Sequence, residues 1–174
     1  MYHAPQLTSE VMAFAKEHEK TMKHCEQLQQ IIEKVNTALS PLEQSQVIMD
    51  LNQLELDFGK ELEPHYYNEE EALFPILGQH IGTTSGIIPD IINEHETLRT
   101  LFQQLQFGIH SLGNQWTIDH VNLVNQASQQ FISFMTKHIE KEDKELYPQV
   151  ESLLSIEEKR QVYYKLYANV KPVQ

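Results

Sequence analysis

Residues 65–75 read HYYNEEEALFP, and residues 138–148 read HIEKEDKELYP. The two stretches share, in register, a histidine, a glutamate four positions later, an acidic residue directly after it, and then leucine, an aromatic residue and proline. Residues four apart lie on the same face of a helix, so each stretch presents an imidazole and a carboxylate together. Ordinary helix composition does not produce this agreement. The repeat therefore indicates two related helices that supply two halves of one site.

Four long segments of the chain repeat apolar residues at helical spacing, with turn signals between them. Residues typical of helix starts stand before these segments: Thr8, Ser40 with Pro41, Pro89 and Thr117. The turns fall at residues 37–41, 76–89 and 113–117, and a capping box from Ser155 to Glu158 opens a shorter fifth helix. Most connections are short, so neighbouring helices should run antiparallel. The sequence predicts an all-α fold, an up-down-up-down four-helix bundle with a short C-terminal helix.

Length and composition narrow the function classes. The 174 residues suit a single domain over 1–174, with the four-helix core over about 8–150 and the C-terminal helix over about 155–170. The net charge of −12 argues against nucleic acid or an anionic membrane as a partner. The single cysteine, Cys25, excludes an internal disulfide and suits a reducing compartment. With no apparent signal peptide and no long apolar run, we expect a cytoplasmic protein that does not enter the membrane.

Each of the four apolar stripes contains one histidine, and two stripes add a glutamate one turn later. These residues are His18, His65, His95, His138, Glu69 and Glu142. Counted from the turns, they should meet at one level of an antiparallel bundle. A single buried histidine is usually a hydrogen-bonded core residue, but burying six ionisable groups together is costly unless something compensates. A bound cation would compensate, because neutral imidazole and ionised carboxylate both donate to it.

The donor types restrict which metal fits. Imidazole and carboxylate without thiolate suit iron, zinc, manganese or copper. Six ligands exceed the set that one tetrahedral zinc takes. Two metals bridged by both carboxylates, with two imidazoles each, would use all six ligands and leave coordination positions open. An open, redox-capable site of this kind points to the chemistry of dioxygen, nitric oxide or peroxide.

The pattern His18 … His65-x-x-x-Glu69 … His95 … His138-x-x-x-Glu142, with its LFP and LYP tails, resembles the hemerythrin-like (HHE) cation-binding family over about residues 10–150. The resemblance implies two iron ions in a non-haem di-iron centre, bridged by an oxo or hydroxo group, with Glu69 and Glu142 as bridging carboxylates. It also implies a small diatomic ligand, O2 or NO, or peroxide as the partner.

The third helix departs from the oxygen-carrying members of that family, which carry His-x-x-x-His there. Arg99 stands in place of the second histidine, so one imidazole is missing. The pattern is closer to the H…HxxxE…H…HxxxE version of bacterial iron–sulfur cluster repair proteins and other stress-response members. We therefore expect a protein that binds or senses O2 or NO, or handles iron in oxidative and nitrosative stress.

Two of the six positions have competitors in the sequence. On the first helix, His24 competes with His18; being six residues apart, they point to different faces, and we favour His18 because its apolar stripe is cleaner. On the fourth helix, Asp143 competes with Glu142. The internal repeat pairs Glu142 with Glu69, so we favour Glu142.

Two other function classes stay open. A di-iron enzyme that decomposes peroxide or oxidises iron would use the same residues, although ferritin-like sites are richer in carboxylate than in imidazole. A bundle that acts only as an interaction module would carry these histidines incidentally. Metal content tests the module, and peroxide turnover tests the enzyme.

Overall fold

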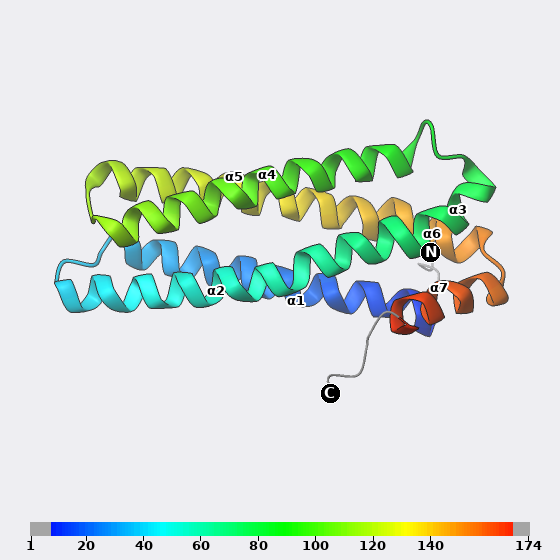
Figure 1. Cartoon of the computed structure of the whole chain (residues 1–174), viewed down its shortest axis with the longest axis horizontal. Coiled ribbons are helices and arrows are strands. Elements are labelled where there is room, and N and C mark those ends of the chain that lie inside the picture. Colours follow the sequence, from blue (N-terminus) through cyan, green and yellow to red (C-terminus); the bar gives the residue numbers. More distant parts are fainter. Residues whose placement is uncertain (1–7, 169–174) are drawn as a thin grey trace, which may run out of the picture.

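The computed structural model describes residues 8–168 and shows four long helices side by side along the longest axis of the molecule (Figure 1). In chain order the elements are α1 Ser9–Val35, α2 Pro41–Asn68, the π-helix η1 Glu69–Leu73, α3 Phe74–Ile81, α4 Ile87–Asn114, α5 Ile118–Lys141, the π-helix η2 Glu142–Leu146, α6 Tyr147–Leu153 and α7 Ile156–Ala168. The chain reverses direction from each long helix to the next (Figure 1). The predicted all-α, up-down-up-down bundle with a short C-terminal helix is confirmed.

Side chains at predicted positions begin α2 and α5. Ser40 and Glu43 form a reciprocal capping box at the start of α2, and the Thr117 hydroxyl accepts a hydrogen bond from a backbone N–H in the first turn of α5. Thr8 precedes α1 as predicted, but its hydroxyl does not cap that helix. It donates instead to Glu151 Oε2 of α6 at 3.1 Å, and so links the start of α1 to the other end of the chain.

The connection predicted over residues 76–89 is shorter in the structure. α3 continues to Ile81 and α4 already begins at Ile87, so the turn is confined to residues 82–86. Gly82 and Gly86 have φ values of 80° and 88° there, a conformation that glycine adopts without a Cβ clash. The prediction was wrong because Pro89 lies inside the first turn of α4. A proline is tolerated there, since its missing N–H would have no partner within the helix.

The apolar core has two parts along the bundle axis. The larger part fills the long half of the bundle and includes Leu51, Phe58 and Phe131. The smaller part lies at the end formed by α3, α6 and α7, and includes Phe14 and Leu77. Between the two parts, the buried residues on all four long helices are polar. None of the helices within residues 8–168 has both the length and the apolar character needed to cross a bilayer.

Candidate metal centre

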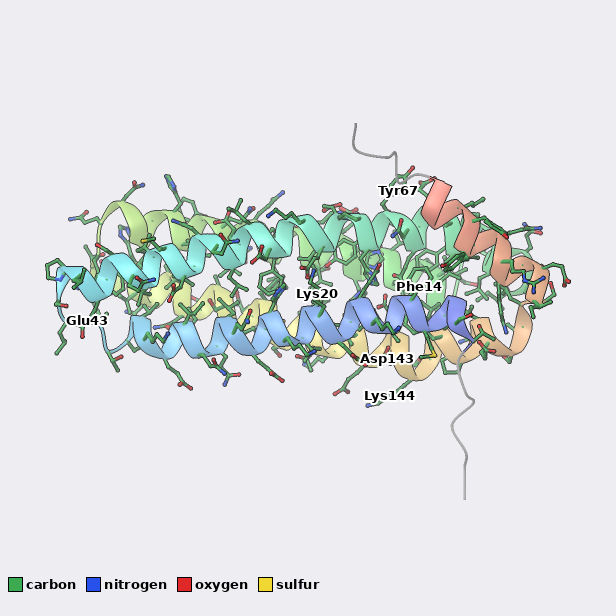
Figure 2. All side chains as sticks on the ribbon, turned by 90° about the horizontal axis from the view of Figure 1, so that it is seen from below. Phe14, Lys20, Glu43, Tyr67, Asp143 and Lys144 are labelled. Carbon is green, nitrogen blue, oxygen red and sulfur yellow. The ribbon has the colours of Figure 1, made fainter. Side chains whose placement is uncertain are left out.

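The six predicted residues converge in this polar layer. His18 comes from α1, His95 from α4, and the two His-x-x-x-Glu pairs from the α2–η1 and α5–η2 junctions. All six are buried: His18, His65, Glu69, His95, His138 and Glu142. Figure 2 shows Phe14 and Lys20 on α1, which flank His18 in the sequence and place the centre toward the end of the bundle that α7 covers.

A π-helix begins at each of the two glutamates. The backbone N–H groups of Phe74 and Tyr147 donate to the carbonyls of Glu69 and Glu142, five residues earlier, instead of four. Each aromatic residue is followed by proline, which has no N–H and whose ring would meet the carbonyl four residues before it in an α-helix. The wider turn accommodates the proline. Such single turns of π-helix are frequent at functional sites, and the doubled aromatic-proline sequence was their only signal.

His18 and His65 form the first imidazole pair. Their Nε2 atoms lie 3.2 Å apart. Glu142 Oε2 lies 2.9 Å from His18 Nε2 and 3.9 Å from His65 Nε2. This carboxylate oxygen therefore faces both imidazoles of the pair.

His95 and His138 form the second pair, which the other oxygen of the same carboxylate faces. Glu142 Oε1 lies 3.6 Å from His95 Nε2 and 3.2 Å from His138 Nε2. Glu69 Oε2 lies 3.3 Å from His95 Nε2 and 3.9 Å from His65 Nε2. Glu142 thus spans the two pairs with one oxygen for each, while Glu69 lies closer to the second.

Every candidate imidazole also contacts a carboxylate on its outer side, through Nδ1. His65 contacts Glu17, His95 contacts Glu70, His138 contacts Glu94 and His18 contacts Asp143, at 2.8, 2.8, 3.0 and 2.9 Å. Such contacts fix the ring orientation and direct Nε2 inward. The sequence did not predict these four partners as a set, although a glutamate directly before a histidine recurs on α1 and α4.

The outer carboxylates differ in their own partners. Glu70 accepts hydrogen bonds from Arg99, and Glu94 accepts one from Lys141. Within residues 8–168, no lysine or arginine lies within ion-pair distance of Glu17 or Asp143, and these two side chains are 49% and 45% exposed. Arg99 contacts Glu63, Glu70 and Glu96 and so supports an outer carboxylate of the centre.

The pKa values of His95 and Glu142 shift in opposite directions within the centre. Burial lowers the pKa of His95, but the nearby carboxylates of Glu142 and Glu69 outweigh burial and raise it to about 9. Burial alone would raise the pKa of Glu142, yet contacts with the imidazoles, His18 first, hold it well below its ordinary value. The buried carboxylate is therefore ionised, and a bound cation could take over the positive charge that the imidazoles supply.

Several buried nitrogen and oxygen atoms that could bind a metal have no hydrogen-bond partner of suitable geometry among the described residues. They are His95 Nε2, His138 Nε2, Glu69 Oε2 and both carboxylate oxygens of Glu142. Unpaired buried polar atoms are costly and rare in folded cores, so this concentration needs a ligand to explain it. Donor atoms close enough to share one ion fall into two groups that have Glu142 in common: His18, His65 and Glu142, and His95, His138 and Glu142. The residues present fit a pair of cations.

The two sequence competitors lie outside this cluster. His24 Nδ1 is 3.1 Å from Glu61 Oε2, in a separate ion pair between α1 and α2. Asp143 contacts the outer nitrogen of His18 and does not face the other imidazoles. Geometry therefore favours His18 and Glu142.

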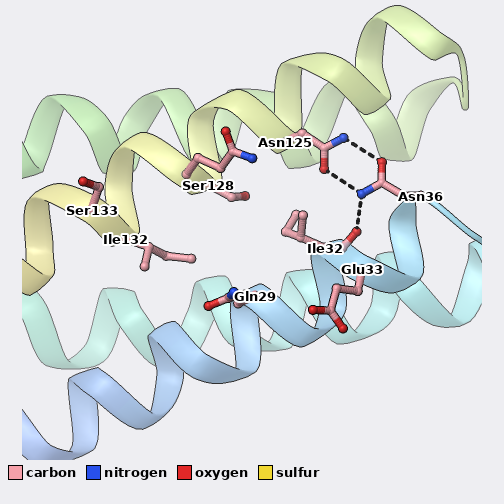
Figure 3. Close-up of a pocket in the computed structure, with 9 residues that line it drawn as sticks. Gln29, Ile32, Glu33, Asn36, Asn125, Ser128, Ile132 and Ser133 are labelled. Atoms are coloured by element: carbon pink, nitrogen blue, oxygen red, sulfur yellow. Dashed lines mark hydrogen bonds between the residues drawn. The ribbon is translucent and has the colours of Figure 1, made fainter.

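Two hollows on the surface differ in their relation to the centre. A cleft of about 180 Å³ between α1 and α2 is lined by Glu17, Lys20, Thr21, Lys60, Glu61, Pro64 and His65, the last of which belongs to the first imidazole pair. A larger one of about 440 Å³ lies between α1 and α5, where Asn36 and Asn125 exchange side-chain hydrogen bonds of 3.2 and 2.8 Å (Figure 3). None of the six candidate residues lines the larger one. His65 is the one candidate ligand among the residues that line the smaller cleft.

Comparison with known protein families gives a match over most of the chain. The family model described as the Hemerythrin HHE cation binding domain matches residues 11–150, a range that contains all six converging residues. No curated protein matches the chain.

Proposed function

The chain belongs to the hemerythrin HHE cation-binding domain family, and from this membership we propose that it binds two iron ions. The proposed ligands are His18, His65, Glu69, His95, His138 and Glu142. The proposed role is to bind or sense O2 or NO, or to handle iron in oxidative and nitrosative stress, as iron–sulfur cluster repair proteins do. When bound, the iron pair would supply redox activity and open coordination positions for such small ligands.

One observation carries the proposal: a single buried carboxylate has one oxygen facing each of two imidazole pairs. Glu142 is fully buried and ionised between His18 and His65 on one side and His95 and His138 on the other. A lone cation would leave one of these pairs, and one carboxylate oxygen, without a partner. The symmetric set of donors therefore supports two metals.

The protein's own residues prepare the centre for a small ligand. The outer carboxylates orient the imidazoles, the two apolar core parts lie on either side of the centre, and a small cleft opens beside His65. The donor set has more imidazole than carboxylate, unlike ferritin-like iron-oxidising sites. This balance favours ligand binding over iron oxidation. The single cysteine and the net charge of −12 further support a cytoplasmic protein without a nucleic-acid partner.

The direct test is metal analysis of the full chain purified without chelator, followed by absorption spectra with and without nitric oxide. We expect two irons per chain and a spectrum that changes when nitric oxide is added. Protein that holds no iron, or takes up only one metal under saturating iron, would contradict the proposal. Rapid peroxide turnover by the iron-loaded protein would point instead to the enzyme alternative.

Matched variants assign the ligands. His18→Ala should lower the iron content, whereas His24→Ala, which changes the neighbouring ion pair with Glu61, should leave it unchanged. Likewise, Glu142→Gln should abolish binding of the pair, whereas Asp143→Asn should only weaken it, by about 10- to 100-fold, as expected for the loss of an outer partner. The reverse order within either pair would reassign that ligand.

A further inference from the structure

The two halves of the centre repeat each other, because each half comes from one helical hairpin. Glu17 of α1 contacts His65 Nδ1 of α2 at 2.8 Å. Its counterpart Glu94 of α4 contacts His138 Nδ1 of α5 at 3.0 Å. The centre thus has approximate two-fold symmetry, and any departure from it distinguishes the two metal positions.

The symmetry is broken at the residue that follows each π-helix. This residue is Phe74 in the first hairpin and Tyr147 in the second. Both rings are buried and both stack on an imidazole, Phe74 on His95 with centroids 6.4 Å apart and Tyr147 on His18 with centroids 5.3 Å apart. Only Tyr147 adds a hydroxyl to the centre.

The Tyr147 hydroxyl contacts two of the candidate ligands. It donates a hydrogen bond to Glu69 Oε1 at 3.0 Å and lies 3.1 Å from His18 Nε2. Glu69 keeps only Oε2 free, and this atom is closer to His95 than to His65, at 3.3 against 3.9 Å. Glu142, the counterpart of Glu69, faces candidate imidazoles with both oxygens: Oε2 lies 2.9 Å from His18 Nε2, and Oε1 lies 3.2 Å from His138 Nε2. Glu142 can therefore offer both carboxylate oxygens to the metals, whereas Glu69 can offer only Oε2.

We propose that Tyr147 is a positioning residue that holds Glu69 by one oxygen and thereby makes the two metal positions unequal. This inference rests on the proposed function for the presence of the metals. Glu69 offers its free oxygen to the position beside His95 and His138. The position beside His18 and His65 then has Glu142 as its one carboxylate, next to a neutral phenol.

The test compares Tyr147→Phe with Tyr66→Phe in the full chain. Tyr66 is also buried and also stacks on a candidate ligand, His95, with centroids 4.2 Å apart, but its hydroxyl has no hydrogen-bond partner among the described residues. The two variants therefore lose the same atom from the same region, and only one of them loses a bond to Glu69.

Titration of the metal-free proteins with Co²⁺, followed by its visible absorption, resolves two binding steps if the positions are unequal. We expect the ratio of the two dissociation constants to fall about tenfold in Tyr147→Phe, the equivalent of one hydrogen bond to a charged acceptor, because Glu69 Oε1 becomes free to serve the other position. Tyr66→Phe should keep the ratio of the unmodified protein. An unchanged ratio in Tyr147→Phe would overturn the proposal.

Crystal structures of the same variants without metal give a second readout. The Glu69 carboxylate should turn away from its present position in Tyr147→Phe and stay in place in Tyr66→Phe. A Glu69 side chain that does not move in Tyr147→Phe would refute the positioning role, whatever the metal content. Failure of the unmodified protein to bind Co²⁺ or iron would instead count against the proposed function.

Discussion

At the scale of single residues, each candidate imidazole is held through its outer ring nitrogen. Nε2 faces the centre, and Nδ1 contacts one of the outer carboxylates described above. A ring anchored at Nδ1 in this way has little freedom to rotate. The donor atoms are consequently in place before a metal arrives, which lowers the entropic cost of binding.

Arg99 supports the centre from its outer side. Its guanidinium contacts Glu63, Glu96 and Glu70 and lies 5.2 Å from the centroid of the Tyr66 ring. Glu70 in turn contacts His95 Nδ1. Arg99 therefore supports the His95 imidazole through Glu70, by a chain of contacts that starts at the surface.

Ser128 provides a test of the core away from the centre. Its hydroxyl is buried and has no hydrogen-bond partner among the described residues. An unpaired buried hydroxyl is destabilising, so Ser128→Ala should raise the free energy of unfolding by about 1 kcal/mol in a denaturant titration. The exposed Ser133 on the same helix is the control, and Ser133→Ala should change stability by less than about 0.5 kcal/mol. A clear loss of stability in Ser128→Ala would reveal a partner for the hydroxyl.

At the scale of elements, the two π-helices decide how the glutamates enter the centre. Each adds one residue to a turn, so the helix continues past Glu69 or Glu142 with its following side chains rotated. This rotation brings Phe74 and Tyr147 against imidazoles of the neighbouring helices. The ligand and the ring that supports it are thus set by one local feature of the backbone.

Replacing Pro148 tests this feature. In Pro148→Ala the new N–H can donate to the carbonyl four residues earlier, which favours an ordinary α-helical turn over the π-helix. Tyr147 and Glu142 would then be misaligned, and we expect Co²⁺ affinity to fall at least about tenfold. Pro64→Ala is the control, because Pro64 lies within the α-helical part of α2. It should leave Co²⁺ affinity unchanged and raise stability. Equal affinities in both variants would separate the π-helix from metal binding.

Local signals explain what the sequence could predict. The caps at Ser40 and Thr117, the apolar stripes and the repeated His-x-x-x-Glu spacing each depend on a few neighbouring residues, so the helices and the six converging residues were predictable. The π-helices were not, because they differ from an α-helix only in which carbonyl the backbone N–H reaches. The role of Tyr147 was not predictable either, since its bond to Glu69 joins positions far apart in the chain.

At the scale of the whole molecule, the centre joins two hairpins. The first hairpin is α1 with α2, and the second is α4 with α5. The interface between the hairpins is apolar on both sides of the polar layer. The polar layer itself contains the buried histidines and glutamates. Without a cation, the cost of burying these ionisable groups opposes the packing that the apolar parts favour.

Removal of the metal should therefore lower stability. At a metal concentration a thousandfold above the dissociation constant, binding contributes about 4 kcal/mol, which corresponds to roughly 8 to 16 °C in melting temperature for a chain of this size. Calorimetry of loaded and chelator-treated protein measures the difference. Glu142→Gln should lose most of it, whereas Asp143→Asn should lose about 1.4 to 2.7 kcal/mol, the equivalent of its 10- to 100-fold weaker binding. A melting temperature that chelation leaves unchanged would argue against a metal that links the hairpins.

The spanning carboxylate has a consequence for assembly. Each hairpin keeps its two imidazoles on one side of the centre and sends its glutamate across: Glu142 reaches His18, and Glu69 lies nearest to His95. The bundle thus resembles a swapped dimer whose two protomers are joined through residues 82–86. Neither protomer has a complete set of ligands by itself. Metal binding would then favour correctly folded chains, because only a chain in which both hairpins are packed together can retain its ions.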